Sequence, residues 1–146
     1  MSDILAKRQA VEAEARTWLG TPYHHQGAVR GAGVDCAMLL IEVYAACGLI
    51  PRIDPRPYPP DWHLHREDER FLGWVEQYAA PVSAPQLGDM ALYRFGRCAS
   101  HGAIVLAWPL VIHANMREGE VVITDATRNA DLTKPGRSAG FFTLFP

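Results

Sequence analysis

Two stretches near the start of the chain have the apolar spacing of helices. Residues 3–19 place apolar positions three or four apart with charged residues between them, which predicts an amphipathic helix that ends before Gly20. Residues 36–47 are apolar on nearly every side, which is typical of a buried central helix. Asp35 suits the N-cap of this second helix, and Gly48 suits its C-terminal end.

The pattern changes along the second half of the chain. Residues 66–80 still place apolar side chains on one face, which predicts a third helix stopped by Pro81. Short apolar runs separated by turn residues follow, and they predict strands of a mostly antiparallel sheet at residues 90–95, 102–107, 110–114, 121–123 and 141–145. Helices followed by strands indicate an α+β fold in which N-terminal helices pack on this sheet.

Two unusual segments lie between the predicted elements. Residues 27–33 are rich in glycine, which predicts a loop where the backbone approaches another group closely. Five of the ten residues at positions 51–60 are proline, so we expect a stiff extended loop there. Tyr58 and Trp62 would give this loop an aromatic surface for docking a partner or for lining a substrate groove.

Size and charge limit the functions that the chain can serve. Its 146 residues match one domain spanning positions 1–146, with a core large enough to carry a site. A net charge of −2, from 14 basic and 16 acidic residues, argues against a nucleic-acid binder. The first residues lack the apolar stretch of a secretory signal and no run is long enough to span a membrane, so we expect synthesis in the cytoplasm without membrane insertion.

Three cysteines without an export signal indicate reduced thiols. Cys36 stands at the predicted start of the central helix, where unpaired N–H groups favour a thiolate and could stabilise an oxyanion. We therefore interpret Cys36 as a nucleophile, the alternative being a small buried apolar residue. Cys47 lies three helical turns further on and is expected to pack in the core, while Cys98 lies in a polar turn with nothing to activate it.

Two histidines could serve this nucleophile. His101 opens one predicted strand, where its side chain could point toward a facing helix tip, and His113 closes the next. In a hairpin centred near Ala107 the two would lie directly opposite each other on one face. We interpret His101 as the base and His113 as its orienting residue; without Cys36 they would be two unrelated histidines at strand ends.

The remaining histidines do not form a metal site. The pairs His24-His25, His63-x-His65 and Cys98-x-x-His101 lack four-ligand zinc spacing, and His63 and His65 are expected to face solvent. We expect neither a metal nor any other cofactor.

Several sequence blocks together resemble a known family. They are Trp18 to Gly27, Gly33-Val34-Asp35-Cys36-Ala37-Met38-Leu39, Leu87 to Leu92, Ser100-His101-Gly102 and Ile112-His113-Ala114. This set is similar to the NlpC/P60 cell-wall peptidases, which are papain-like cysteine peptidases. The segment Tyr58-Pro59-Pro60-Asp61-Trp62 and the C-terminal Phe145-Pro146 resemble the short members found in phage tails and gene transfer agents.

The resemblance implies a papain-like fold and a site. Cys36 would be the nucleophile, His101 the base and His113 the third residue, with Tyr23 and Asp35 in the oxyanion and substrate-binding part. Such enzymes hydrolyse peptidoglycan stem peptides, often between D-glutamate and diaminopimelate. Met38 stands where many members have a smaller residue, which could alter the pocket behind the nucleophile.

The resemblance also implies partners and leaves alternatives open. A phage-like tail or baseplate would carry the protein to a target cell wall in the periplasm. An amidase or acyltransferase could use the same triad, and a structural tail-tip plug could retain incidental activity.

Overall fold

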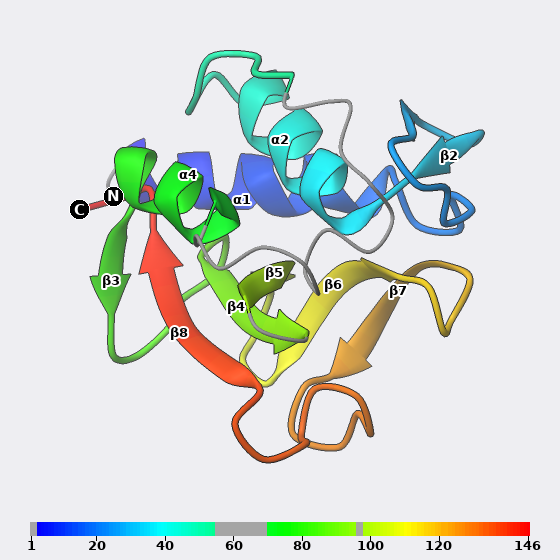
Figure 1. The fold of residues 1–146 in the computed structure, drawn as a ribbon. Coiled ribbons are helices and arrows are strands. Elements are labelled where there is room, and N and C mark those ends of the chain that lie inside the picture. Colours follow the sequence, from blue (N-terminus) through cyan, green and yellow to red (C-terminus); the bar gives the residue numbers. More distant parts are fainter. Residues whose placement is uncertain (1–2, 55–69, 96–97) are drawn as a thin grey trace.

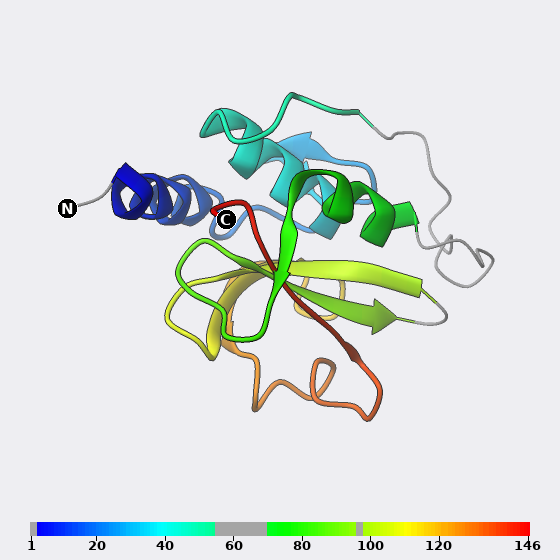
Figure 2. The same ribbon diagram turned by 90° about the vertical axis from the view of Figure 1, so that its left-hand side faces the viewer.

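The computed structural model describes residues 3–54, 70–95 and 98–146. Three helices, α1 (Asp3–Arg16), α2 (Cys36–Ala46) and α4 (Arg70–Tyr78), lie on one side of a six-stranded sheet (Figures 1 and 2). The strands run in the order β3-β8-β4-β5-β6-β7, and each neighbouring pair is antiparallel. Their bounds are β3 (Ala80–Val82), β4 (Met90–Phe95), β5 (Cys98–Val105), β6 (Leu110–Asn115), β7 (Glu120–Asp125) and β8 (Ser138–Thr143). The predicted α+β fold is confirmed.

Helix α2 begins where its sequence predicts and ends one residue earlier, at Ala46. The carboxylate of Asp35 accepts a hydrogen bond from the backbone N–H of Met38 at 2.9 Å, which caps the first turn. Gly48 adopts a φ of 73°, a left-handed conformation that costs glycine little and ends the helix. Between these ends the helix is buried on most sides, as Leu39, Leu40 and Tyr44 are inaccessible to solvent.

The other two helices differ from prediction at their ends. Helix α1 stops at Arg16 rather than at residue 19, because the chain turns at Thr17 and directs Trp18 into the core. Helix α4 ends at Tyr78, and Pro81 lies in the short edge strand β3, where a missing backbone N–H is tolerated. The predicted residues 66–69 of this helix lie outside the described residues.

The central strands are apolar on both faces because both faces of the sheet are covered. Alternate residues such as Leu92 and Ile104 join the main core under the helices. Their neighbours, including Tyr93, Ala103 and Val111, form a second cluster with Ala126 and Leu132 from the chain around and after the end of β7. The connection between β7 and β8 therefore covers the face of the sheet that the helices leave open.

Strands β5, β6, β7 and β8 are longer than predicted, β5 and β8 end two residues before the predicted ends, and one hairpin is shifted. Strands β5, β7 and β8 begin earlier than their apolar runs, because backbone pairing continues through polar residues. The β5–β6 hairpin pairs Ile104 with Ile112 and closes around Trp108, so its centre lies one residue after the predicted Ala107. Strand β3 and the two-residue strands β1 (Ala28–Val29) and β2 (Gly33–Val34) are too short to leave an apolar pattern.

The glycine-rich stretch is tightly packed against its own backbone. A Cβ atom on Gly27 would lie 2.7 Å from the backbone of Gly33, and one on Gly33 would lie 2.7 Å from His24. The close approach predicted from the glycines is therefore made between β2 and the chain just before β1. Residues 55–60 of the predicted proline loop, and Trp62 beyond them, lie outside the described residues.

Candidate active site

The structure places Cys36 at the first turn of α2, facing Ser100 of β5. Its Sγ donates a hydrogen bond to the backbone carbonyl of Ser100 at 3.5 Å. Asp35, just before it, accepts a second hydrogen bond from the backbone N–H of Gln26 at 2.8 Å. The capped helix start and the loop that carries Gln26 together fix the position of the thiol.

His101 and His113 lie side by side in a buried pair. The Nε2 atom of His101 is 2.8 Å from the Nδ1 atom of His113, and the two rings meet edge to face. On its other side His101 stacks on Phe95, with ring centroids 4.8 Å apart. His113 is inaccessible to solvent, so it touches the cleft only through His101.

The predicted geometry of this pair is wrong in two respects. The shifted hairpin sets His113 opposite Ala103, so the two histidines are diagonal rather than directly opposite. His101 is the fourth residue of β5 rather than its first, and it lines one cleft with Cys36 at the start of α2. Ser100 is an extra residue between the pairs that β5 makes with β4, and this bulge decides the face.

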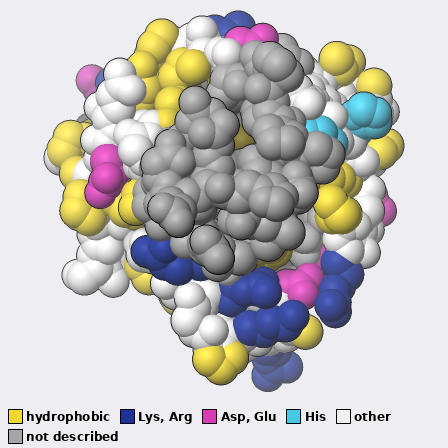
Figure 3. All heavy atoms as spheres, viewed as in Figure 1, with side chains coloured by type: hydrophobic (Ala, Val, Ile, Leu, Met, Phe, Trp, Pro, Cys, Tyr) yellow, Lys and Arg dark blue, Asp and Glu magenta, His cyan; other side chains and the backbone are white. Residues whose placement is uncertain are grey.

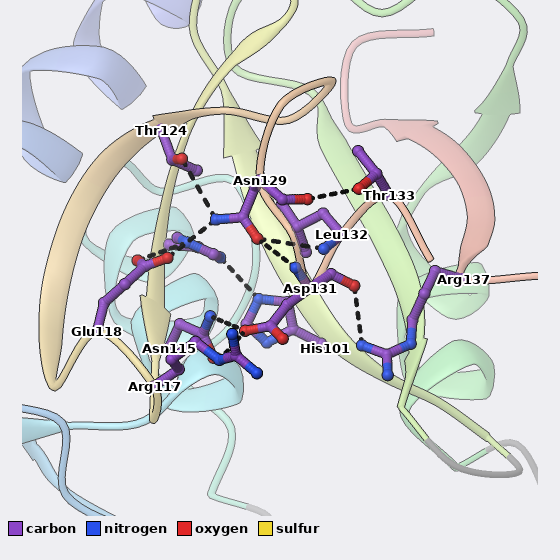
Figure 4. A network of polar contacts seen from close by, with 11 residues as sticks. His101, Asn115, Arg117, Glu118, Thr124, Asn129, Asp131, Leu132, Thr133 and Arg137 are labelled. Carbon is purple, nitrogen blue, oxygen red and sulfur yellow. Dashed lines mark hydrogen bonds and ion pairs between the residues drawn. The ribbon is translucent and has the colours of Figure 1, made fainter. Parts of the chain in front are cut away.

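Two further residues continue the polar contacts beyond the histidines. The Oε2 atom of Glu118, in the β6–β7 turn, lies 3.0 Å from Nε2 of His113, within hydrogen-bonding distance. Asn129, in the β7–β8 connection, donates to the second carboxylate oxygen of Glu118 at 2.9 Å. Figure 4 shows the Asn129 side chain directed toward Glu118. Sequence reasoning missed them, since neither stands in an apolar pattern or a motif.

Asp131 organises the side of the site next to His101. Its carboxylate accepts from the amide of Asn115 at 3.3 Å and pairs with Arg117 at 3.1 Å. Its backbone carbonyl accepts from Arg137 at 2.9 Å, and the Arg137 guanidinium lies 4.2 Å from the ring centre of Phe95. Arg117 and Arg137 thus flank Asp131 next to His101 (Figure 4).

A cleft of about 350 Å³ brings most of the predicted site residues together. Tyr23, Asp35 and Cys36 line it from the helix side, while His101 and Arg137 line it from the sheet side. Tyr23 is held there by its backbone N–H, which donates to Gly119 of the β6–β7 turn at 2.8 Å.

Two other residues singled out in the sequence lie away from the cleft wall. Met38 is buried in the main core, and Cys47 packs partly buried against the same core. Of Cys98 only the backbone is described, at the start of β5.

The electrostatics of the site favour neutral forms of both central groups. Burial and the Asp35 charge raise the pKa of Cys36 to about 12, although the backbone N–H groups of Gly102, Ala37 and Cys36 itself act against this rise. Burial, followed by the neighbouring His113 and Arg137, lowers the pKa of His101 well below 6.5. The expectation that the helix start favours a resting thiolate is therefore not met, because burial outweighs it.

This charge state predicts how Cys36 reacts with an alkylating agent. In a Cys47→Ala/Cys98→Ala background, inactivation by iodoacetamide should accelerate about tenfold per pH unit between roughly pH 7 and 10, following the thiolate fraction. The check is the inactivation rate across this range, with a small amide substrate or an active-site label as readout. A plateau already reached below about pH 8 would show a low-pKa thiolate instead.

Tyr23, like Cys36, has a raised pKa and stays protonated. Burial and the charges of Cys36 and Asp35 raise its pKa above the usual 10, so its hydroxyl keeps its proton as a hydrogen-bond donor.

Within residues 3–54, 70–95 and 98–146, no group of three His, Cys, Asp or Glu side chains is arranged to hold a metal ion. His63 and His65 lie outside these ranges.

Solved structures with this fold agree with the family resemblance. The NlpC/p60 domain of the peptidoglycan hydrolase SagA superposes with a TM-score of 0.59 at 20% identity, covering 93% of this chain and 97% of that one. An NLP/P60 lipoprotein-like protein from Staphylococcus aureus gives 0.69 at 20% identity, covering 100% of this chain and 43% of that one. The peptidoglycan hydrolase RipB from Mycobacterium tuberculosis gives 0.65 at 18% identity, covering 100% and 69%.

These matches differ in how much of the relative they include. The chain spans less than half of the staphylococcal protein but nearly all of the SagA domain. No curated protein sequence matches the chain. The sequence model of the NlpC/P60 family matches residues 20–134, which include every residue of the cleft described above except Arg137. The chain belongs to the NlpC/P60 family.

Proposed function

We propose that this protein is a cysteine peptidase that hydrolyses peptidoglycan stem peptides at a D-glutamate–diaminopimelate type of bond. The observation that carries the proposal is the cleft in which Cys36 and His101 meet, with His113 behind His101. Two of the structural relatives, SagA and RipB, are described as peptidoglycan hydrolases, which supports the substrate class.

In this mechanism His101 moves the proton of the thiol. Its Nε2 is bonded to His113, so Nδ1 is the nitrogen left for Cys36. As Sγ attacks the scissile carbonyl, Nδ1 takes the thiol proton, and the imidazolium then protonates the leaving amine. Water next attacks the thioester carbon while His101 accepts its proton, and the thiol is restored when the acyl group leaves as a carboxylic acid.

The oxyanion of each tetrahedral intermediate needs donors near the sulfur. The backbone N–H groups of Cys36 and Ala37 already act on the thiol, and both lie at the start of α2. Tyr23 adds a hydroxyl that burial keeps protonated. We assign these three groups to the oxyanion site.

The charges around the cleft support binding of an anionic end of the substrate on the sheet side. Lys and Arg side chains gather on the lower part of the face seen in Figure 3, over the β7–β8 connection. Within the cleft, Arg137 is held in place by Phe95 and by the Asp131 carbonyl, and no carboxylate of the described residues forms an ion pair with it. A γ-linked D-glutamate and its diaminopimelate neighbour both carry free carboxylates that this guanidinium could bind.

Replacing Arg137 tests this assignment. Arg137→Gln should lower kcat/KM by roughly 10- to 100-fold for a stem peptide whose glutamate carboxylate is free, since hydrogen bonds to charged groups contribute about 1.5–3 kcal/mol. A second peptide carries a carboxamide in place of the free glutamate α-carboxylate. On this peptide Arg137→Gln and the wild type should have nearly equal kcat/KM. Arg128→Gln, an exposed arginine of the same connection, is the matched control. An equal loss on both peptides would exclude a carboxylate partner.

Delivery by a phage-like tail or baseplate is the second part of the proposal. It rests on the resemblance of residues 58–62 and 145–146 to tail-type members, and on a net charge of −2 that gives no general attraction to an anionic envelope. Among the described residues, no helix has the length and apolar character needed to cross a membrane. Co-purification with tail-tip proteins supports delivery, whereas rapid lysis of intact diderm cells by added protein contradicts it.

Digestion of purified sacculi tests the reaction itself. Mass analysis should find stem peptides shortened at the D-glutamate–diaminopimelate bond, with a Cys36→Ala sample as the blank. Release of whole stem peptides would indicate an amidase, and a transfer product formed only with an added amine acceptor would indicate an acyltransferase. No product above the blank would favour a structural role.

A further inference from the structure

The hydrogen-bond chain that starts at His101 continues two residues past His113. His101 Nε2 lies 2.8 Å from His113 Nδ1, and His113 Nε2 lies 3.0 Å from Glu118 Oε2. Asn129 then donates from Nδ2 to Glu118 Oε1 at 2.9 Å. Both nitrogens of His113 are therefore used, one on each side.

The end of the chain at Asn129 has only one orientation. Its Oδ1 accepts two backbone hydrogen bonds, from Asp131 at 2.9 Å and Leu132 at 3.2 Å. Its Nδ2 must then face the other way, toward Glu118 and the hydroxyl of Thr124 at 3.3 Å. Asn129 is thereby fixed as a donor, and Glu118 is held by a turn that Gly119 closes with a φ of 79°.

When the residue behind the base is itself a histidine, as His113 is here, the two rings alone do not fix which nitrogens carry the protons. Two neutral histidines in contact can carry their protons in either of two directions. In one direction His113 accepts at Nδ1, His101 donates from Nε2, and the Nδ1 lone pair of His101 is available to a thiol. In the other direction His101 carries its proton on Nδ1 and cannot act as the base.

We propose that Glu118 is a positioning residue that sets the direction of this proton chain, with Asn129 holding its carboxylate. An ionised carboxylate only accepts hydrogen bonds, so His113 must donate to it from Nε2 and accept at Nδ1. His101 must then donate from Nε2, which leaves Nδ1 as the base. The inference rests on the proposed function, because it assumes that His101 serves Cys36.

The charges around the histidines are consistent with neutral rings in both positions. Burial lowers the pKa of His113, while Glu118 and Asp131 act in the opposite direction. His101 has its pKa lowered by burial, His113 and Arg137. Phe95 and Tyr93 face His101 from β4 and carry no charge that opposes this state. With both rings neutral at pH 7, their tautomers decide whether the base is available.

Nitrogen NMR of the histidine side chains tests the proposal without turnover. In the wild-type protein at neutral pH, His101 and His113 should both be protonated at Nε2 and unprotonated at Nδ1. In Glu118→Gln, whose amide can also donate, a second population with protonated Nδ1 should appear on both rings. A wild-type His101 protonated at Nδ1 would overturn the proposal, whatever the activity of the enzyme.

Kinetics provide the second readout. Glu118→Gln should lower kcat by roughly 10- to 100-fold with little change in KM, less than the ~10⁴-fold loss seen when a carboxylate that directly orients a catalytic histidine is removed. Glu118→Asp should recover part of this loss. Glu120→Gln, the same change two residues along the hairpin, should match the wild type in kcat and in both tautomers.

The outcomes separate this inference from the proposed function. A wild-type protein that cleaves no stem peptide would refute the function, while the tautomers could still be read. Wild-type kcat and unchanged tautomers in Glu118→Gln would refute the inference alone. Thermal unfolding of each variant checks that a loss of kcat does not reflect a loss of fold, and an unfolded Glu118→Gln sample leaves the wild-type tautomers as the deciding measurement.

Discussion

Cys36→Ala is expected to lower kcat/KM on stem peptides by at least about 10⁴-fold, because the attacking atom is gone and only binding and oxyanion stabilisation remain. His101→Ala should be as damaging, since a nucleophile and its base act as one unit. The measurement is steady-state hydrolysis of a synthetic stem peptide, with muropeptide analysis to confirm the product.

The structure supplies a control for this experiment. Cys36 is only half-buried and makes one long hydrogen bond, so its loss should leave the unfolding midpoint nearly unchanged. Cys47→Ala removes a thiol of similar size that packs against the main core and should keep its activity. Hydrolysis above a few per cent of wild type in Cys36→Ala would exclude Cys36 as the nucleophile.

Arg8→Ala is expected to destabilise the fold by about 3–5 kcal/mol, the cost of leaving a buried charge without its partner. Arg8 is 7% exposed and donates from Nη1 to Asp89 Oδ1 at 2.9 Å and to the Leu87 carbonyl at 2.7 Å. Asp89 is 1% exposed, so its carboxylate would lose its charged partner in a buried environment. For a chain of this length the unfolding midpoint should fall by roughly 10 °C.

A second ion pair on the same helix serves as the comparison. Arg16 and Glu12 form an exposed pair at 2.8 Å, and Arg16→Ala should cost well under about 1 kcal/mol. Arg8→Met combined with Asp89→Leu should regain much of the stability, because no buried charge is then left unpaired. Equal losses for Arg8→Ala and Arg16→Ala in urea titrations would contradict this account.

The parts of the fold that depend on local pattern could be predicted from the sequence. Helix α2 was predictable because Asp35, an apolar run and Gly48 all act within a few residues of one another. The grouping of Cys36, His101 and His113 was predictable as a chemical set, and the structure brings the first two to one cleft with the third behind. Their roles stay predictions until they are tested.

The parts that depend on distant contacts could not be predicted. Arg8 looks like any charged residue of an amphipathic helix until Asp89, 81 positions away, is brought beside it. Glu118 and Asn129 are single polar residues in turns, and only the folded hairpin aligns them with His113. The face of His101 depends on one extra residue, Ser100, which the alternation of apolar positions does not reveal.

The β7–β8 connection limits how the proposed substrate choice of this protein could be changed. The same dozen residues supply Leu132 to the second core, Asn129 to the Glu118 carboxylate and Arg137 to the cleft wall. A graft of this segment from a relative, made to change the proposed substrate choice, would therefore also exchange part of the support of the proposed base, His101, and part of the hydrophobic packing. The residue proposed to set specificity and the residues that stabilise the fold thus lie on one segment. A successful graft has to bring its matching partners on β4, β5 and the β6–β7 turn.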